Sequence, residues 1–574
     1  MDNNILERVN HWLEGPYDET DKAEIRRMMR EDEKELSESF YRDLEFGTGG
    51  LRGIMGVGSN RMNRYTVGTA TQGLANYLKL SFPAADLKVA IAHDSRNHSR
   101  DFAEVAAAVL SANDIDCYLF EALRPTPELS FTVRHLNCHA GIVVTASHNP
   151  KEYNGYKVYW QDGGQLVPPH DKNIMTEVGK ISSIDEVKWQ KKTGKIHSIG
   201  KEVDEVYLTK IKNLSLNPQT IAEQKNLSIV YTPLHGTGIT LVPKALQLFG
   251  FQNVTILEKQ ATPDGDFPTV ASPNPEEKTA MEMVLQKAKE IDADLVLATD
   301  PDADRMGIAA KDHHGEWQLF NGNMTASLLV HYILSQKARE TDFKDKFIVK
   351  TIVTTELINA MAQDFAIDCE DVLTGFKYIA EQIRKFEGKK EFLVGGEESY
   401  GTLVSDFVRD KDAVSACCMI AELAAVLKSQ GRSLFDLLLQ LYQKYGLYKT
   451  ELLSLTKKGQ DGVKEIADMM KHFRECPPQA LENYKILKIK DFKTQKTYYP
   501  QNNKEEDILL PSSNVLQFFT EEGDKITVRP SGTEPKIKFY FEVRSDLQKA
   551  ADFDEISAKL SEKIEIFKQF MINY

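Results

Sequence analysis

Short apolar runs alternate with stretches of helical periodicity in three successive blocks of about 100 residues each, between residues 87 and 401. Strands that alternate with helices are typical of mostly parallel sheets covered by helices. The pattern therefore predicts three related α/β domains. The apolar runs are LKVAIAHDS, DCYLF and AGIVVTASHNP in the first block, LSIVYTPLHGTG, NVTILE and ADLVLATDPDADR in the second, and FIVKTIV, CEDVLTG and EFLVGGEESYG in the third.

The stretches between the apolar runs predict helices, and so does the N-terminus. NILERVNHWLEG has an apolar face at helical spacing, and the charged stretch DETDKAEIRRMMREDEKELSESFYRDL after it is largely free of helix breakers. The glycine-rich loop FGTGGLRG follows. The helices expected inside the three blocks cover residues 101–113, from 127, 239–249, 276–290, from 356, and 376–386.

The pattern changes from about residue 450. The charged helical stretch DGVKEIADMMKHFRE precedes two prolines, and DKITVRPSGTEPKIKFYFEVR then predicts two apolar strands around a Gly/Pro loop. This indicates a fourth domain of the α+β class. The predicted domains cover residues 1–210, 211–322, 323–448 and 449–574.

Composition limits the class of protein. Of the 574 residues, 41% are hydrophobic and 27% are charged, so the chain can bury cores, and its formal net charge of −14 disfavours nucleic acid and anionic membranes as partners. The N-terminus has no apolar core of a signal peptide, and no apolar stretch approaches the roughly 18 residues of a membrane span. The six scattered cysteines lack zinc spacing and fit reduced thiols. A cytoplasmic location is expected.

Acidic residues follow the last apolar run of the second block in TDPDADR. Asp300, Asp302 and Asp304 converge at a strand end, where they repel one another unless a cation lies between them. Oxygen ligands of this kind suit Mg²⁺ or Ca²⁺. An EF-hand does not fit, because Arg305 and Lys311 occupy the positions of its glycine and its last glutamate. The remaining alternative is a solvated acidic turn.

Two further loops carry polar groups. RPSGTEPK combines Arg529 with hydroxyls and a turn whose backbone N–H groups can cradle phosphate oxygens, although it can also be an ordinary hairpin turn. GGEESYG places Glu397 and Ser399 after an apolar run, and such groups suit the hydroxyls of a polyol. The alternative for GGEESYG is a helix N-cap with acidic residues in the first turn.

The loop TASHNP presents Ser147 at the end of an apolar run. Ser147 does not lie in the G-x-S-x-G motif of α/β-hydrolases, and the chain has no Walker A motif. A serine beside a metal-binding loop can instead carry a phosphoryl group. The alternative is simple capping of the loop by Ser147 and His148.

In combination, TASHNP, DPDADR, GEES and RPSGTEPK resemble the α-D-phosphohexomutase superfamily, in the same order and at domain-scale spacing over nearly the whole chain. The resemblance implies an α/β fold of four domains around a central cleft: three related α/β domains with mixed sheets and a C-terminal α+β domain. It implies a phosphoserine loop in the first predicted domain, a metal-binding loop in the second, a sugar-binding loop in the third and a phosphate-binding loop in the fourth.

The resemblance also implies residue roles. Ser147 would carry the phosphoryl group and would bind one Mg²⁺ per chain together with Asp300, Asp302 and Asp304. Lys157 would be a general acid/base with a lowered pKa, and Arg52 and His148 would lie beside the phosphoserine. His93–Arg96 (HDSR) also matches the family. The residues that would contact the sugar phosphate are Glu397, Ser399, Lys377, Arg305, Arg529, Ser531, Gly532 and Thr533.

The implied reaction interconverts glucose 1-phosphate and glucose 6-phosphate through glucose 1,6-bisphosphate, which is both intermediate and activator. GEES favours glucose, whereas YTPLHGTG and the long N-terminus are similar to the longer branch that also includes phosphopentomutases. Phosphomannomutase and phosphopentomutase activities, and a non-catalytic sensor of sugar phosphates, are the alternatives. The expected partners are small sugar phosphates, with no nucleic acid and no membrane, for a monomer or homodimer.

Overall fold

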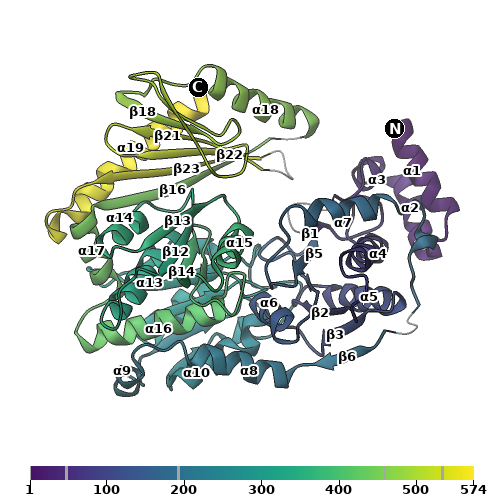
Figure 1. Cartoon of the computed structure of the whole chain (residues 1–574), viewed down its shortest axis with the longest axis horizontal. Helices are drawn as coiled ribbons and strands as arrows, with labels where there is room; N and C mark the ends of the chain where they lie inside the picture. Colours follow the sequence, from purple (N-terminus) through teal and green to yellow (C-terminus); the bar gives the residue numbers. More distant parts are fainter. Residues whose placement is uncertain (1, 46–49, 191–193, 458, 532–535) are drawn as a thin grey trace.

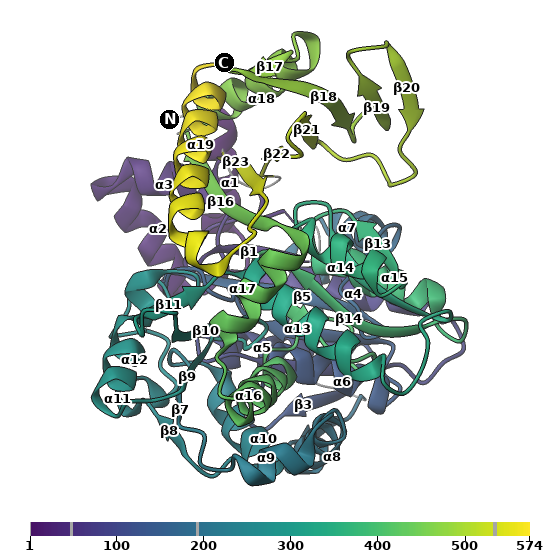
Figure 2. The same cartoon turned by 90° about the vertical axis from the view of Figure 1, so that its left-hand side faces the viewer.

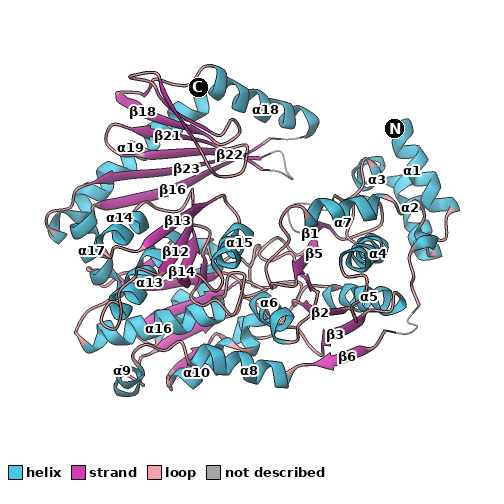
Figure 3. Cartoon of the chain, in the orientation of Figure 1, coloured by secondary structure: helices cyan, strands magenta, loops and turns pink. Residues whose placement is uncertain are grey.

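The computed structural model describes residues 2–45, 50–190, 194–457, 459–531 and 536–574, and these contain four β-sheets that follow one another along the chain (Figure 1). The first three sheets are mixed and carry helices, and the fourth is antiparallel (Figure 3). The predicted class, three α/β domains followed by an α+β domain, is therefore confirmed.

The first sheet has six strands in the order β1-β5-β4-β2-β3-β6. These are β1 (Gly50–Ile54), β2 (Lys88–His93), β3 (Asp116–Phe120), β4 (Ala140–Val144), β5 (Tyr153–Trp160) and β6 (Ile196–Ile199), with helices α4 (Arg64–Ser81), α5 (Ser99–Ala112), α6 (Thr126–His135), α7 (His170–Gly179) and α8 (Lys201–Lys212). Along β2, Val89 and Ile91 belong to one core, and Ala90 and Ala92 to another. Burial on both faces explains why this strand is a continuous apolar run.

The second sheet has the order β11-β10-β9-β7-β8, and the third has the order β13-β12-β14-β15. The second contains β7 (Ile229–Thr232), β8 (Val254–Ile256), β9 (Leu295–Thr299), β10 (Met306–Lys311), β11 (Trp317–Phe320), α9 (Pro218–Glu223), α10 (Val242–Phe249), α11 (Glu258–Ala261) and α12 (Lys278–Glu290). The third contains β12 (Lys346–Thr351), β13 (Asp368–Val372), β14 (Glu391–Glu397), β15 (Gly401–Leu403), α13 (Gly322–Lys337), α14 (Leu357–Asp364), α15 (Phe376–Phe386), α16 (Ala413–Ser429) and α17 (Leu434–Tyr445).

One connection pattern recurs in these three sheets. The first strand of each pattern (β2, β7 or β12) lies in the middle, the next (β3, β8 or β13) pairs with one side of it, and the third (β4, β9 or β14) pairs with the other, all in parallel. A fourth strand (β5, β10 or β15) then returns antiparallel to the third. The loops with Ser147, with the three aspartates and with Glu397 all occupy the turn between the third and fourth strands.

The fourth sheet lies above the third in Figure 1 and is followed by the C-terminal helix. Its strands are β16 (Leu447–Thr456), β17 (Ala480–Leu481), β18 (Tyr484–Asp491), β19 (Lys496–Tyr499), β20 (Lys504–Asp507), β21 (Leu516–Thr520), β22 (Lys525–Pro530) and β23 (Lys536–Ser545), with helices α18 (Gly459–Glu475) and α19 (Phe553–Asn573). The two strands expected around RPSGTEPK are β22 and β23, and residues 532–535 between them lie outside the described residues.

The N-terminus forms three helices that cover one end of the first domain, at the right of Figure 1. They are α1 (Asn3–Glu14), α2 (Glu19–Glu31) and α3 (Glu33–Phe40). The charged stretch expected to be helical forms two helices that meet at Asp32. The carboxylate of Asp32 accepts a hydrogen bond from the backbone N–H of Glu35, at 2.9 Å, and so caps α3. Trp12 of α1 packs edge-on against Phe40 of α3 and Tyr65 of α4, which joins these three helices.

Within the described residues, no single helix has the length and apolar character needed to cross a membrane. In the part of the chain that the structure describes, one pair of helices, α16 and α17, meets those criteria when the two are taken together, and they are bent by 87° relative to one another. The apolar side chains of both helices lie in the largest core of the molecule.

Candidate active site

The Ser147 loop follows β4 and is held in a strained conformation. Ser147 has a φ of 53°, in the left-handed region that non-glycine residues rarely adopt, and it is buried. The turn is fixed by the backbone N–H of Ser147, which donates to Thr145 Oγ1 at 2.8 Å. Ala303 and Tyr400 have similar positive φ values in the two loops at the equivalent positions. All three turns are thus bent sharply at or next to residues that carry the candidate chemistry.

Arg96 of the HDSR segment holds the Ser147 loop from behind. Its guanidinium donates to the carbonyl oxygens of Ser147 (2.6 Å), Pro150 (2.8 Å), Tyr153 (3.0 Å) and Asn149. The Arg96 side chain is buried and lies 3.4 Å from the carboxylate of Asp94. HDSR is therefore the support of the loop.

We expect Arg96→Ala to lower the midpoint of thermal unfolding by about 10 °C, because it leaves the buried Asp94 carboxylate and four carbonyls uncompensated, at a cost of about 3–5 kcal/mol. Differential scanning calorimetry measures this. Arg96→Lys keeps the charge but loses the planar fork, so it should fall between wild type and alanine. A midpoint for Arg96→Ala within about 2 °C of wild type would contradict the supporting role.

Asp300, Asp302 and Asp304 form a buried carboxylate cluster at the end of β9, with one oxygen of each within 4.8 Å of the others. Ser147 Oγ donates to Asp300 Oδ2 at 2.6 Å, so the serine loop of the first domain meets the acidic loop of the second. Asp302 Oδ1 and Asp304 Oδ1 have no hydrogen-bond partner within the described part of the chain. Buried carboxylate oxygens without donors are suited to a hard cation, so the cluster can bind a metal ion. The solvated acidic turn is wrong.

Two lysines lie against this cluster. Lys157 Nζ is 2.8 Å from Asp302 Oδ2 and 3.4 Å from Asp304 Oδ2, and Lys411 Nζ is 3.2 Å from Asp304 Oδ2. Burial lowers the pKa of Lys157, but the carboxylates of Asp302 and Asp304 outweigh it and raise that pKa above its usual value. The lowered pKa expected for Lys157 is therefore wrong for this arrangement, in which its ammonium neutralises the acidic loop.

The three loops are tied to one another by contacts between domains. Thr126, at the start of α6, donates through Oγ1 to Asp302 Oδ2 at 2.9 Å and through its backbone N–H to the Asp302 carbonyl at 2.9 Å. The backbone N–H of Met306 donates to the Tyr400 carbonyl at 3.0 Å, which joins the acidic loop to the Glu397 loop. Neither Thr126 nor Lys411 was singled out from the sequence. Lys411 lies in a charged RDKD stretch, which was a usable signal, whereas Thr126 has no local signature.

The neighbours of Ser147 include His148 and Arg52. His148 Nδ1 lies 3.2 Å from Ser147 Oγ, and burial together with Arg305 and Arg52 holds the pKa of His148 well below its usual value. Arg52 donates from Nη1 to Asn149 Oδ1 at 3.3 Å, so it contacts the same loop. Arg305 follows the three aspartates, and its guanidinium pairs with Glu276.

The GEES loop is the turn of the hairpin between β14 and β15, so the helix N-cap is wrong there. Glu397 is buried and accepts from the backbone N–H of Gly375 at 3.0 Å. Burial raises the pKa of Glu397, against the opposing effect of Lys411 and Arg305. Burial and the adjacent Glu397 raise the pKa of Glu398 to about 7, while Lys538 and Arg529 of the fourth domain act in the opposite direction. Arg529 therefore acts electrostatically on the GEES loop.

The remaining predicted residues lie in the fourth domain and in the first turn of α15. Ser531 closes the β22–β23 turn through its backbone N–H, which donates to the Lys536 carbonyl at 2.7 Å. Gly532 and Thr533 lie outside the described residues. Lys377 lies in the first turn of α15 and lines a small cavity with Trp160 and His170 of the first domain. Burial lowers the pKa of Lys377.

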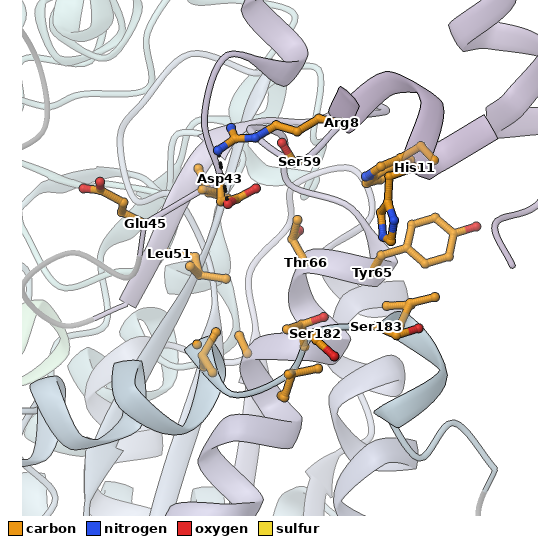
Figure 4. Close-up of a pocket in the computed structure, with 18 of the residues that line it drawn as sticks. Arg8, His11, Asp43, Glu45, Leu51, Ser59, Tyr65, Thr66, Ser182 and Ser183 are labelled. Atoms are coloured by element: carbon orange, nitrogen blue, oxygen red, sulfur yellow. Dashed lines mark ion pairs between the residues drawn. The ribbon is translucent and has the colours of Figure 1, made fainter. Parts of the chain in front are cut away.

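A separate cavity of about 610 Å³ lies under the N-terminal helices (Figure 4). Arg8 and His11 of α1 point into it, opposite Thr66 of α4 and the segment with Ser182. Asp43 forms an ion pair with Arg8 at 3.6 Å across one side. None of the predicted catalytic or metal-binding residues lines this cavity.

Comparison with known proteins decides the family. Four models of the phosphoglucomutase/phosphomannomutase family match the chain in order: α/β/α domain I over residues 43–185, domain II over 205–315, domain III over 321–445, and the C-terminal domain over 457–559. The chain belongs to this family. Membership makes it a phosphohexomutase, an isomerase that acts on sugar phosphates.

Individual relatives support the same assignment. The chain is 39% identical over 533 residues to a phosphoglucomutase of Staphylococcus aureus (strain MSSA476), which covers 92% of this chain and 94% of the relative. Among solved structures, the open form of parafusin, a phosphoglucomutase from Paramecium, superposes with a TM-score of 0.67 at 20% identity, covering 92% of this chain and 96% of that one. A phosphoglucomutase/phosphomannomutase family protein from Burkholderia thailandensis superposes with a TM-score of 0.65 at 18% identity, covering 92% and 96%. The two structures share the fold.

Proposed function

We propose that the chain is a phosphoglucomutase that interconverts glucose 1-phosphate and glucose 6-phosphate through phosphorylated Ser147 and glucose 1,6-bisphosphate. The observation that carries this proposal is the contact of Ser147 Oγ with Asp300 inside a buried cluster of three aspartates. The 39% identity to a named phosphoglucomutase supports the choice of glucose phosphates.

The proposed reaction has two phosphoryl transfers. In the first, the bond between phosphorus and Ser147 Oγ breaks, a bond forms to the free hydroxyl of the sugar monophosphate, and the hydroxyl proton leaves to a base. The bisphosphate then reorients in the site, so that its other phosphate faces Ser147. In the second transfer, its other phosphate returns to Ser147 Oγ and the sugar oxygen regains a proton. Lys157, within the acidic cluster, is proposed to hold the transferred proton after its ammonium has given up its own proton, a loss that a cation bound by Asp302 and Asp304 would favour.

Asp300, Asp302 and Asp304 are proposed to hold one Mg²⁺ per chain with the Ser147 phosphate. When bound, Mg²⁺ neutralises phosphate charge during transfer. His148 lies on the same loop as Ser147, and Arg52 of β1 contacts that loop through Asn149. Both are proposed to orient the phosphate on Ser147 and stabilise its charge.

The sugar phosphate is proposed to bind between the GEES loop and the fourth domain. Glu397 would accept hydrogen bonds from the sugar hydroxyls, and Ser399 would donate or accept them. Arg305 and Lys377 would add positive charge. The phosphate that does not react would lie at the β22–β23 loop, against Arg529, Ser531, Gly532 and Thr533. Because the same residues would bind the sugar hydroxyls and the same loop would bind the non-reacting phosphate each time, the site could accept the sugar in both orientations.

A panel of sugar 1-phosphates tests the function. With Mg²⁺ and glucose 1,6-bisphosphate as activator, we expect kcat/KM for glucose 1-phosphate to exceed those for mannose, ribose and glucosamine phosphates by about tenfold or more, the scale of a few lost hydroxyl contacts. Coupled assays for each product measure this. A higher value for mannose or ribose phosphate would favour phosphomannomutase or phosphopentomutase. Binding without turnover of any member would favour a sensor.

A cytoplasmic location and a monomeric or homodimeric state are also proposed, on the basis of the composition and the family. Light scattering coupled to size-exclusion chromatography distinguishes one chain from two.

A further inference from the structure

A second group of possible metal ligands lies far from Ser147 in the fold, at the turn between β10 and β11. His313 and His314 occupy this turn in the second domain, and Asp554 lies in the first turn of α19 in the fourth. Both histidine Nε2 atoms point at the same oxygen, Asp554 Oδ2, at 3.1 Å from His313 and 2.9 Å from His314. We call these three residues the His–His–Asp cluster.

The spacing of the cluster matches a tetrahedral transition-metal site. Ligand atoms about 2.0–2.1 Å from a tetrahedral Zn²⁺ lie about 3.3–3.4 Å from one another. The two nitrogen–oxygen distances are only a few tenths of an ångström shorter, and one ligand atom from each side chain lies within 4.8 Å of the others. A small outward shift of exposed side chains would therefore admit the ion.

The turn that carries the two histidines is rigid. The side chain of Asp312 accepts hydrogen bonds from the backbone N–H groups of His314 (2.8 Å) and Glu316 (3.0 Å), which closes the turn from inside. The imidazole of His313 is stacked on Phe435 at 5.3 Å and lies edge-on to Phe553 at 5.9 Å. The ring of His313 is thus oriented by aromatic contacts before any ion binds.

The elements around the His–His–Asp cluster belong to three domains. Figure 2 shows the lower end of α19 close to α17, and Tyr442 of α17 stacks on Phe553 at the start of α19. His313 and Asp554 also line a cavity of about 550 Å³ between these domains. An ion in the cluster would therefore hold the β10–β11 turn to α19, and water from the cavity or from solvent can complete its coordination.

We propose that the His–His–Asp cluster is a second metal site that binds Zn²⁺ or a similar transition-metal ion and links the second domain to the fourth. Two imidazoles and one carboxylate are the ligands of a borderline ion, whereas the three carboxylates beside Ser147 select a hard ion. The side chains of His314 and Asp554 are 61% and 59% exposed, so the ion has direct access.

Titration with Co²⁺ in the presence of saturating Mg²⁺ tests the site. The full chain is expected to develop the visible absorption of a low-coordinate Co²⁺ bound to imidazole, with one ion per chain. His314→Asn and Asp554→Asn should each weaken this binding by more than about 100-fold, beyond the roughly 10–100-fold that the loss of a supporting residue causes. The signal should persist in Asp304→Asn, which separates it from the carboxylates beside Ser147.

A matched control is available at His98, an exposed histidine whose Nδ1 lies 2.9 Å from Asp101 without a second histidine in that pair. His98→Asn should bind Co²⁺ as wild type does. Zn²⁺ should raise the midpoint of thermal unfolding of wild type and of His98→Asn but not of His314→Asn, because only an intact cluster binds the ion in the folded state. Equal Co²⁺ affinity in wild type and His314→Asn would overturn the proposal, as would wild type without the imidazole absorption.

Discussion

Replacing Ser147 by alanine is expected to lower kcat/KM for glucose 1-phosphate by about 10⁴-fold or more, because the covalent acceptor of the phosphoryl group is lost. The side chain is small, and among the described residues its Oγ hydrogen-bonds with Asp300 and His148. The fold should therefore survive, and the loss should appear in kcat. A coupled assay for glucose 6-phosphate measures the activity, and intact-mass spectrometry should detect one phosphoryl group on wild type and none on Ser147→Ala.

The matched control is Ser272→Ala. Ser272 Oγ donates to the carbonyl of His148 at 3.2 Å, so it contacts the same loop but cannot receive the phosphoryl group in the proposed reaction. Loss of one such hydrogen bond costs about 1 kcal/mol, which corresponds to a change of about tenfold at most. Retention of the phosphoryl group in Ser147→Ala, or turnover near that of wild type, would contradict the role of Ser147.

The order of elements could be predicted from the sequence because the strands of the three α/β domains are buried on both faces. Burial on both faces gives apolar runs such as VAIA in β2 and LVLA in β9, which stand out from the amphipathic helices around them. The antiparallel returns β5, β10 and β15 were not assigned. Each of these strands follows a polar loop directly, so the sequence shows no boundary between the loop and the strand.

The candidate site could be predicted only where its residues form a local motif. Ser147 and the three aspartates each follow an apolar run, so strand position and charge indicated them. Arg96 and Thr126 act through contacts with loops that are remote in the sequence: Arg96 holds the carbonyls of residues 147–153, and Thr126 holds Asp302. Spacing carries no signal for such contacts. The raised pKa of Lys157 likewise depends on two carboxylates of another domain.

The second large effect is expected for Asp304→Asn, which should weaken activation by Mg²⁺ by about 100-fold and lower kcat at saturating Mg²⁺ by about 10³-fold. Asparagine has the shape of aspartate but lacks its charge, so it removes one anionic ligand without opening a cavity. It also leaves Lys157 and Lys411 with one carboxylate fewer, and their positive charges then oppose the ion. Activity measured against Mg²⁺ concentration, with Mn²⁺ binding followed by electron paramagnetic resonance, separates affinity from turnover.

Asp292→Asn is the control for this substitution. Asp292 lies in the same domain and pairs with Lys311, but its side chain is 88% exposed, so its charge is screened by solvent and contributes little. It should follow the wild-type Mg²⁺ curve, because an exposed carboxylate with one lysine partner gives an ion no desolvated oxygens. The buried Asp304 Oδ1 has no donor among the described residues, and this difference is what suits Asp304 to bind a metal ion. If Asp304→Asn and wild type gave the same dependence of activity on Mg²⁺ concentration, the three carboxylates would be shown to pair with the lysines and not to bind an ion.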